Sequence, residues 1–127
     1  MAVERPLHIL FVDDQPSDAE LAVRRLRKGG LEFTWARVES GPALVDALKT
    51  RGPDLIISDY AMPAFSGLEA LAIAISHDPE IPIIILTGAL NPEAAVACFE
   101  AGAWDYLSKP VDPDQLLAVL RSWLRRA

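Results

Sequence analysis

The chain has 127 residues and a mass of 13.8 kDa, which is the size of one domain with a single hydrophobic core. Hydrophobic residues make up 51% of it and charged residues 24%, a balance that excludes an intrinsically disordered chain. The formal net charge of −6 leaves no basic excess to replace phosphate counterions, so direct binding of nucleic acid is not expected.

Apolar runs alternate with helix-like segments along the whole chain. The apolar runs predict strands at residues 7–12, 33–38, 55–57, 83–87 and 106–108. The segments that follow them predict helices at residues 17–28, 42–50, 66–76 and 91–102, and from 112 almost to 127. We therefore expect one domain over residues 1–127, with its core between about 7 and 124.

Several of these helices carry a recognisable start signal. Ser17 with Glu20, and Ser66 with Glu69, have the spacing of a capping box, in which two side chains satisfy free backbone N–H groups. Asn91 stands before a proline, which favours a helix that begins there. The predicted strands and helices therefore alternate with short connections.

Alternating strands and helices imply a parallel sheet that is covered by helices on both faces. The first, third and fourth apolar runs are almost free of polar residues, as interior strands should be. The second run contains Thr34 and Arg37, and the fifth is short, so both are expected at the sheet edges. The predicted fold is α/β, a flavodoxin-like (βα)5 three-layer sandwich with a five-stranded parallel sheet in the order 2-1-3-4-5.

Reactive side chains follow four of the five predicted strands, at the edge where ligands bind in such sheets. Asp13 and Asp14 follow the first strand, Asp59 the third, Thr87 ends the fourth and Lys109 follows the fifth. Three neighbouring carboxylates repel one another unless a cation lies between them, and Mg²⁺ prefers oxygen ligands. A lysine and a hydroxyl can bind phosphoryl oxygens, and a carboxylate can itself accept a phosphoryl group.

The motifs at these strand ends also have a characteristic order and spacing. They are Asp13-Asp14, the segment Ser58-Asp59-Tyr60-Ala61-Met62-Pro63 followed by Ser66-Gly67, the pair Thr87-Gly88, and Tyr106 shortly before Lys109-Pro110. In this combination the chain resembles the receiver domain of two-component response regulators, of the kind found in chemotaxis regulators. The resemblance extends over nearly the whole chain.

The resemblance implies a role for each residue of the site. Asp59 would be the phosphoacceptor, and the donor would be a histidine kinase or a phosphotransfer protein. Asp14 and Asp59 would ligate Mg²⁺ or Mn²⁺ directly with the backbone carbonyl of Ala61, while Asp13 would act mainly through water. Lys109 would bind the phosphoryl group, and its peptide bond to Pro110 would be cis.

The resemblance also implies a switch and an output surface. Thr87 would move toward the phosphoryl group, and Tyr106 would then turn inward. The face formed by the fourth helix, the fifth strand and the fifth helix would bind an output partner that the sequence does not identify. Small residues of the fourth helix are compatible with a homodimer: Ala94, Ala95, Ala97 and Ala101.

Other classes of protein fit the sequence less well. A degenerate receiver that acts only as a protein-interaction scaffold would not need the complete set of site residues. A haloacid-dehalogenase-like phosphohydrolase needs a second aspartate two residues after its nucleophile, where this chain has Gln15. A flavodoxin-like FMN carrier needs a phosphate-binding loop where Asp13 and Asp14 would repel phosphate. We therefore expect a signalling module and not an enzyme, one that catalyses only its own phosphorylation and dephosphorylation.

The remaining composition indicates the compartment. A single cysteine, Cys98, excludes an internal disulfide and a paired-cysteine metal or redox site. The longest apolar runs have about six residues, whereas a membrane span needs roughly 20. The sequence therefore predicts a cytoplasmic domain without a membrane span.

Overall fold

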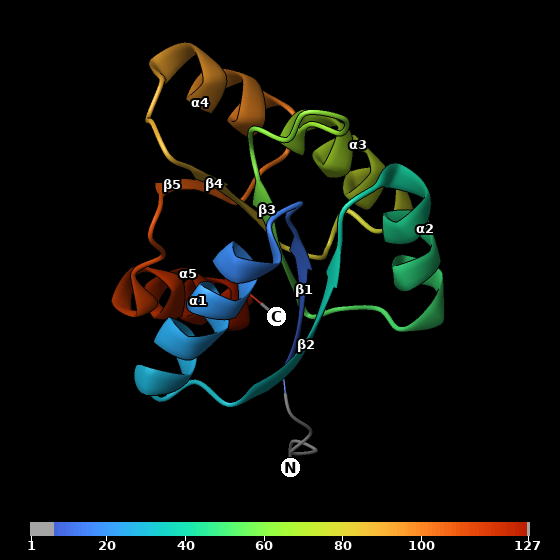
Figure 1. The fold of residues 1–127 in the computed structure, drawn as a ribbon. Coiled ribbons are helices and arrows are strands. Elements are labelled where there is room, and N and C mark those ends of the chain that lie inside the picture. Colours follow the sequence, from blue (N-terminus) through green and yellow to red (C-terminus); the bar gives the residue numbers. More distant parts are fainter. Residues whose placement is uncertain (1–6, 127) are drawn as a thin grey trace.

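The computed structural model describes the backbone of residues 7–126 and the side chains of residues 7–122, so both ends of the predicted domain lie outside the described residues. Strands and helices alternate in this region (Figure 1). The elements in chain order are β1 (Leu7–Val12), α1 (Pro16–Lys28), β2 (Phe33–Val38), α2 (Gly41–Thr50), β3 (Leu55–Asp59), α3 (Gly67–His77), β4 (Ile83–Thr87), α4 (Pro92–Glu100), β5 (Asp105–Ser108) and α5 (Pro113–Arg126).

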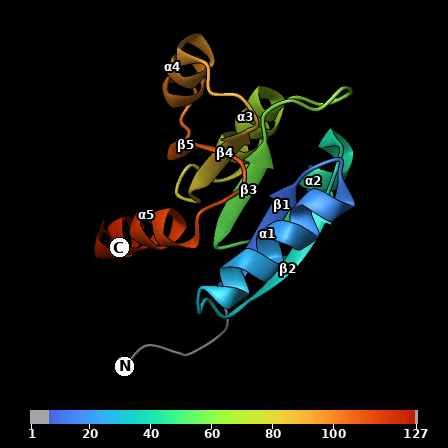
Figure 2. The ribbon, with the colours of Figure 1, turned by 60° about the vertical axis from the view of Figure 1, so that its left-hand side comes forward.

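The five strands form one parallel sheet in the order β2-β1-β3-β4-β5. Helices α1 and α5 cover one face of the sheet, and α2, α3 and α4 cover the other (Figures 1 and 2). The predicted flavodoxin-like three-layer sandwich and its strand order are therefore confirmed.

The sheet separates two hydrophobic cores, because successive side chains of a strand point to opposite faces. In β1, Ile9 and Phe11 pack with α1 and α5, whereas Leu10 and Val12 pack with α2 and α3. Every residue of β3 and β4 is buried, while β2 and β5 are partly exposed. The assignment of the two less apolar strands to the sheet edges is thus also confirmed.

Two of the three helix start signals are confirmed and one is wrong. Ser66 and Glu69 form the capping box at the start of α3, and the Asn91 side chain accepts the N–H of residue 94. Helix α1, however, begins at Pro16 with Gln15 as its N-cap, and its N-cap makes no side-chain hydrogen bond. The proline takes the first helical position, which places Ser17 inside the first turn, where it cannot be the N-cap.

The end of α4 and its surface differ in detail from the sequence-based expectation. The helix ends at Glu100, two residues before Gly102, whose φ of +107° favours glycine. Ala94 and Ala95 pack against the core. The exposed apolar side chains of α4 are Val96, at 56% exposure, and Phe99, at 49%.

Candidate functional site

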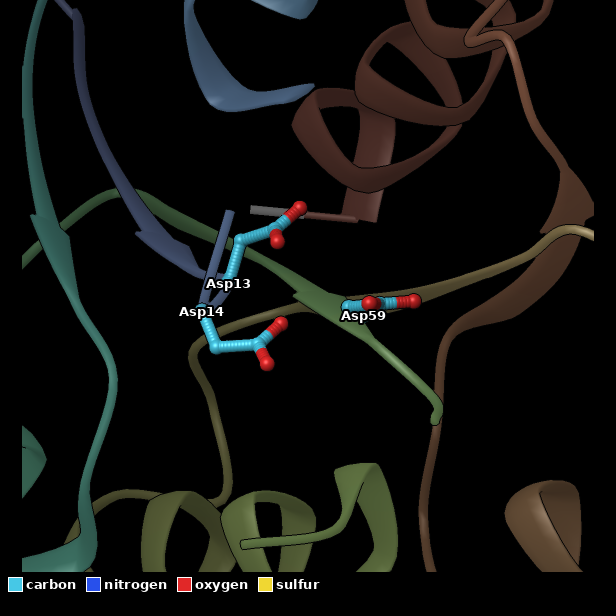
Figure 3. A group of neighbouring side chains, drawn as sticks. All are labelled: Asp13, Asp14 and Asp59. Carbon is cyan, nitrogen blue, oxygen red and sulfur yellow. The ribbon is translucent and has the colours of Figure 1, made fainter. Parts of the chain in front are cut away.

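Three carboxylates meet at the carboxyl end of the sheet (Figure 3). Asp13 and Asp14 follow β1, and Asp59 is the last residue of β3. One oxygen from each of the three lies within 4.8 Å of the others. Asp13 and Asp59 are buried and Asp14 is half-buried. The structure therefore brings together the three carboxylates that the sequence predicted at this edge.

Local hydrogen bonds hold the loop that carries Asp13. Its backbone N–H donates to the carbonyl of Val38 at 3.0 Å, and its own carbonyl accepts from the Arg37 guanidinium at 2.9 Å. Its side chain accepts the N–H of Gln15 at 2.9 Å, directly before α1. The chain reversal between β1 and α1 thus fixes one carboxylate oxygen of Asp13 and leaves the other directed toward the site.

The close approach of α3 positions Asp59. A Cβ atom at Gly67 would lie 2.7 Å from the carbonyl oxygen of Asp59 and 2.8 Å from the Cα of Tyr60. These distances are too short for any residue with a side chain unless the backbone shifts. Gly67 therefore lets the first turn of α3 pack directly against the end of β3.

Lys109 brings a positive charge to the same place. Its Nζ lies 3.3 Å from a carboxylate oxygen of Asp59 and 3.7 Å from one of Asp13. The Lys109–Pro110 peptide bond is cis, in agreement with the sequence-based expectation, and the Lys109 N–H donates to the carbonyl of Thr87 at 2.8 Å. The site thus combines the Lys109 ammonium with a cluster of carboxylate oxygens.

Thr87 and Tyr106 lie on the other side of Asp59, beside α4 and away from the pocket that Asp13, Asp59 and Lys109 line. The buried Thr87 hydroxyl donates to the carbonyl of Ala89 at 3.0 Å, and it accepts the N–H of the same residue at 3.3 Å. Tyr106 is only 8% exposed, and its ring packs edge-on against Tyr60, with ring centroids 6.2 Å apart. The inward position that the switch hypothesis assigns to the phosphorylated state is therefore already occupied in this structure.

Comparison with known proteins assigns the family. The model of the response regulator receiver domain matches residues 9–121, which covers most of the chain. The chain belongs to this family. A receiver-domain protein from Methanospirillum hungatei JF-1, described as CheY-like, has a TM-score of 0.80 and 25% identity, with 96% of each chain covered. A protein assigned as a response regulator from Chloroflexus aurantiacus J-10-fl has a TM-score of 0.82 and 32% identity, with 95% of this chain and 99% of that chain covered.

Longer proteins also contain a region similar to this receiver domain. The DNA-binding transcriptional regulator NtrC of Klebsiella pneumoniae is 39% identical over 110 residues. That match covers 87% of this chain but only 23% of NtrC. The chain therefore spans about a quarter of this relative, and the DNA binding in that relative's name is said of the longer protein.

Burial and neighbouring charges in the receiver-domain site shift the pKa of two groups. Burial raises the pKa of Asp13 above its ordinary value, although the hydrogen bond from Gln15 and the charge of Lys109 act in the opposite direction. Burial lowers the pKa of Lys109, but a hydrogen bond to Asp18 and the surrounding carboxylates together raise it. The surroundings therefore disfavour the charged carboxylate of Asp13, whereas they favour the charged ammonium of Lys109.

The donor set of the acidic cluster fits a hard divalent cation. All three side chains offer carboxylate oxygens, which are the ligands that Mg²⁺ and Mn²⁺ prefer. The role of the Ala61 carbonyl as a further ligand stays a prediction.

Among residues 7–126 no helix is long and apolar enough to cross a bilayer.

Sequence reasoning missed one charged residue of the site. Asp18, in the first turn of α1, accepts a hydrogen bond from the Lys109 ammonium at 3.0 Å. Asp18 follows Asp14 by four positions, and residues four apart share one face of a helix. Because Asp14 lies before α1 begins, this spacing is only a weak signal, and nothing in it points to Lys109.

Proposed function

We propose that Asp59 accepts a phosphoryl group from a phosphohistidine on a histidine kinase or a phosphotransfer protein. The observation that carries this proposal is the position of the Asp59 carboxylate. It lies 3.3 Å from the Lys109 ammonium and shares a cluster with two further carboxylates. Phosphoryl transfer requires mainly positioning and charge stabilisation from a protein, and this site supplies both.

Each site residue has a distinct task in this proposal. Asp14 and Asp59, with the backbone carbonyl of Ala61, would hold Mg²⁺ or Mn²⁺, and Asp13 would act mainly through water. A cation held by these residues would supply charge neutralisation to the phosphoryl oxygens. Asp59 supplies the attacking oxygen, and Lys109 pairs with a phosphoryl oxygen. No separate substrate is turned over, because the acceptor is part of the chain.

The consequence of phosphorylation is proposed to pass through Thr87. Its hydroxyl donates a hydrogen bond to the carbonyl of Ala89 in this structure. On phosphorylation the hydroxyl would donate to a phosphoryl oxygen in place of that carbonyl. Phosphorylation would stabilise the inward position that Tyr106 has in this structure. The surface of α4, β5 and α5 would then bind a partner or an output domain, and this surface carries the exposed Val96 and Phe99.

Intact-protein mass spectrometry tests the proposal. The protein is incubated with acetyl phosphate and Mg²⁺, beside Asp59→Asn, a chelator control and Asp46→Asn, which removes an exposed carboxylate on α2. We expect the mass of one phosphoryl group on the wild type and on Asp46→Asn, and none on Asp59→Asn or with chelator.

A second candidate is a receiver that binds partners without phosphorylation. It predicts no adduct with acetyl phosphate or with a phosphorylated histidine kinase, and no change in melting temperature when Mg²⁺ is added. The ion pair between Lys109 and Asp59 favours the phosphoacceptor over this scaffold.

A further inference from the structure

The closest acidic partner of Lys109 does not lie at the edge of the sheet. The ammonium is 3.0 Å from a carboxylate oxygen of Asp18, closer than its distances to Asp59 and Asp13. The Asp18 side chain is 45% exposed, whereas those of Asp13 and Asp59 are 9% exposed. The partly exposed Asp18 carboxylate therefore pairs with the Lys109 ammonium, on which the proposed reaction depends.

Asp18 also lines an entrance to the site. A pocket of about 190 Å³ lies between α1 and the loop that follows β5. Its lining includes three carboxylates, two basic residues and apolar side chains such as Leu21: Asp13, Asp18, Asp59, Lys109, Arg25 and Leu21. Because Asp18 is the most exposed of the three carboxylates in this lining, an anion that enters from solvent passes close to its charge.

The charge balance shows what Asp18 adds. Lys109 and a divalent cation would bring three positive charges to the site, and Asp13, Asp14 and Asp59 bring three carboxylates. Asp18 adds a fourth carboxylate, which is not part of the acidic cluster. Its charge therefore opposes the arrival of a further anion, and its hydrogen bond occupies one of the three N–H donors of Lys109.

We propose that Asp18 is a positioning residue that selects among phosphoryl donors by disfavouring those that carry a free double negative charge. The proposal rests on the proposed function of Asp59 as acceptor. Asp18 acts through Lys109 and through its own field, and it does not touch the reacting atoms.

Two small donors separate the effect of donor charge from general reactivity. Acetyl phosphate is a dianion at neutral pH, whereas phosphoramidate, protonated on nitrogen, carries one net negative charge. In both reactions an Asp59 oxygen bonds to phosphorus and the bond between phosphorus and the donor breaks. The electron pair leaves on acetate in the first case and on ammonia in the second, so no further reactant is needed.

The test compares the rates of phosphorylation of wild type and Asp18→Asn with each donor, followed by intact mass at low salt with saturating Mg²⁺. We expect Asp18→Asn to react about fivefold faster with acetyl phosphate and no more than about twofold faster with phosphoramidate. The gain should shrink at about 0.5 M salt, because an exposed charge is screened. Asp18→Glu should restore the wild-type ratio of the two rates.

The matched control is Glu20→Gln, which removes an exposed carboxylate from the same helix. It should leave the ratio unchanged. Equal gains with both donors, or no gain with acetyl phosphate, would overturn the role of Asp18 while leaving Asp59 as the acceptor. No adduct on any variant with either donor would instead count against the proposed function itself. A merely structural role of Asp18 would alter the melting temperature without altering the donor ratio.

Discussion

The two sides of Asp59 differ in how their polar groups are partnered. On one side, Lys109 lies within 3.7 Å of three carboxylates, and Asp13 is tied to the backbone of the loop before α1. On the other side, the Thr87 hydroxyl bonds to the backbone of Ala89 and to no other group among the residues that the structure describes. The Tyr106 hydroxyl is buried, and no hydrogen-bond partner reaches it within the described residues.

This difference separates the chemistry of the site from its proposed readout. Ion pairs already place the charged groups where a phosphoryl group would need them. The hydroxyl groups retain bonding capacity that the present arrangement does not use, and a buried hydroxyl without a partner costs stability. A new set of oxygens on Asp59 would therefore change the Thr87 and Tyr106 side more than the Lys109 side.

The largest expected effect comes from the charged side. Lys109→Gln should slow phosphorylation by acetyl phosphate by about 100-fold, because a positioned donor to the phosphoryl group is lost. Mg²⁺ should bind at least as tightly as before, since a positive charge has been removed beside the carboxylates. Mass spectrometry and calorimetry measure the two quantities, with Lys49→Gln on α2 as the control. A near-normal rate would mean that the ion pairs of Lys109 are structural only.

A smaller effect is expected from the buried charge of Asp13. Asp13→Asn should stabilise the metal-free fold by about 1 kcal/mol near neutral pH, because burial disfavours the charged carboxyl. The folded-state pKa of Asp13 is raised, so the wild type loses stability as pH rises through the unfolded and then the folded value. The advantage of the variant should therefore grow with pH.

Denaturant unfolding in chelator, from about pH 4 to about pH 8, measures this advantage. Asp46→Asn, at an exposed position on α2, is the control and should show no such growth. A constant difference across the pH range would contradict the assignment of the effect to the charge of Asp13. Added Mg²⁺ should reverse the order of stability, because it favours the charged cluster.

The smallest effect is expected on the side of the hydroxyl groups. Tyr106→Phe should raise the free energy of unfolding by about 0.5 kcal/mol, since it removes a buried hydroxyl that lacks a partner and keeps the packing on Tyr60. Tyr60→Phe, at a half-buried position, serves as the control and should change stability less. A loss of stability in Tyr106→Phe would show that the hydroxyl contributes to the fold, and the contrast between the two sides would fail.

Much of the architecture was predictable because it depends on local patterns. The apolar runs that became β1, β3 and β4 are almost free of polar residues, and only interior strands of a parallel sheet bury both faces. Parallel strands also end at a common edge, which is why Asp13, Asp14 and Asp59 could be placed together. The start of α1 was less predictable, because the proline at residue 16 and the spacing of Ser17 gave competing signals.

The sequence by itself determined the layers, the strand order and the edge at which the reactive residues gather. Only the tertiary structure decided how those residues are paired. Lys109 and Asp18 are 91 positions apart, and their contact depends on how α1 lies beside the loop after β5. The inward position of Tyr106 depends in the same way on Tyr60. Strand periodicity predicts the face of the sheet to which a side chain points. The contacts of a long or aromatic side chain also depend on its rotamer and on how distant elements pack around it.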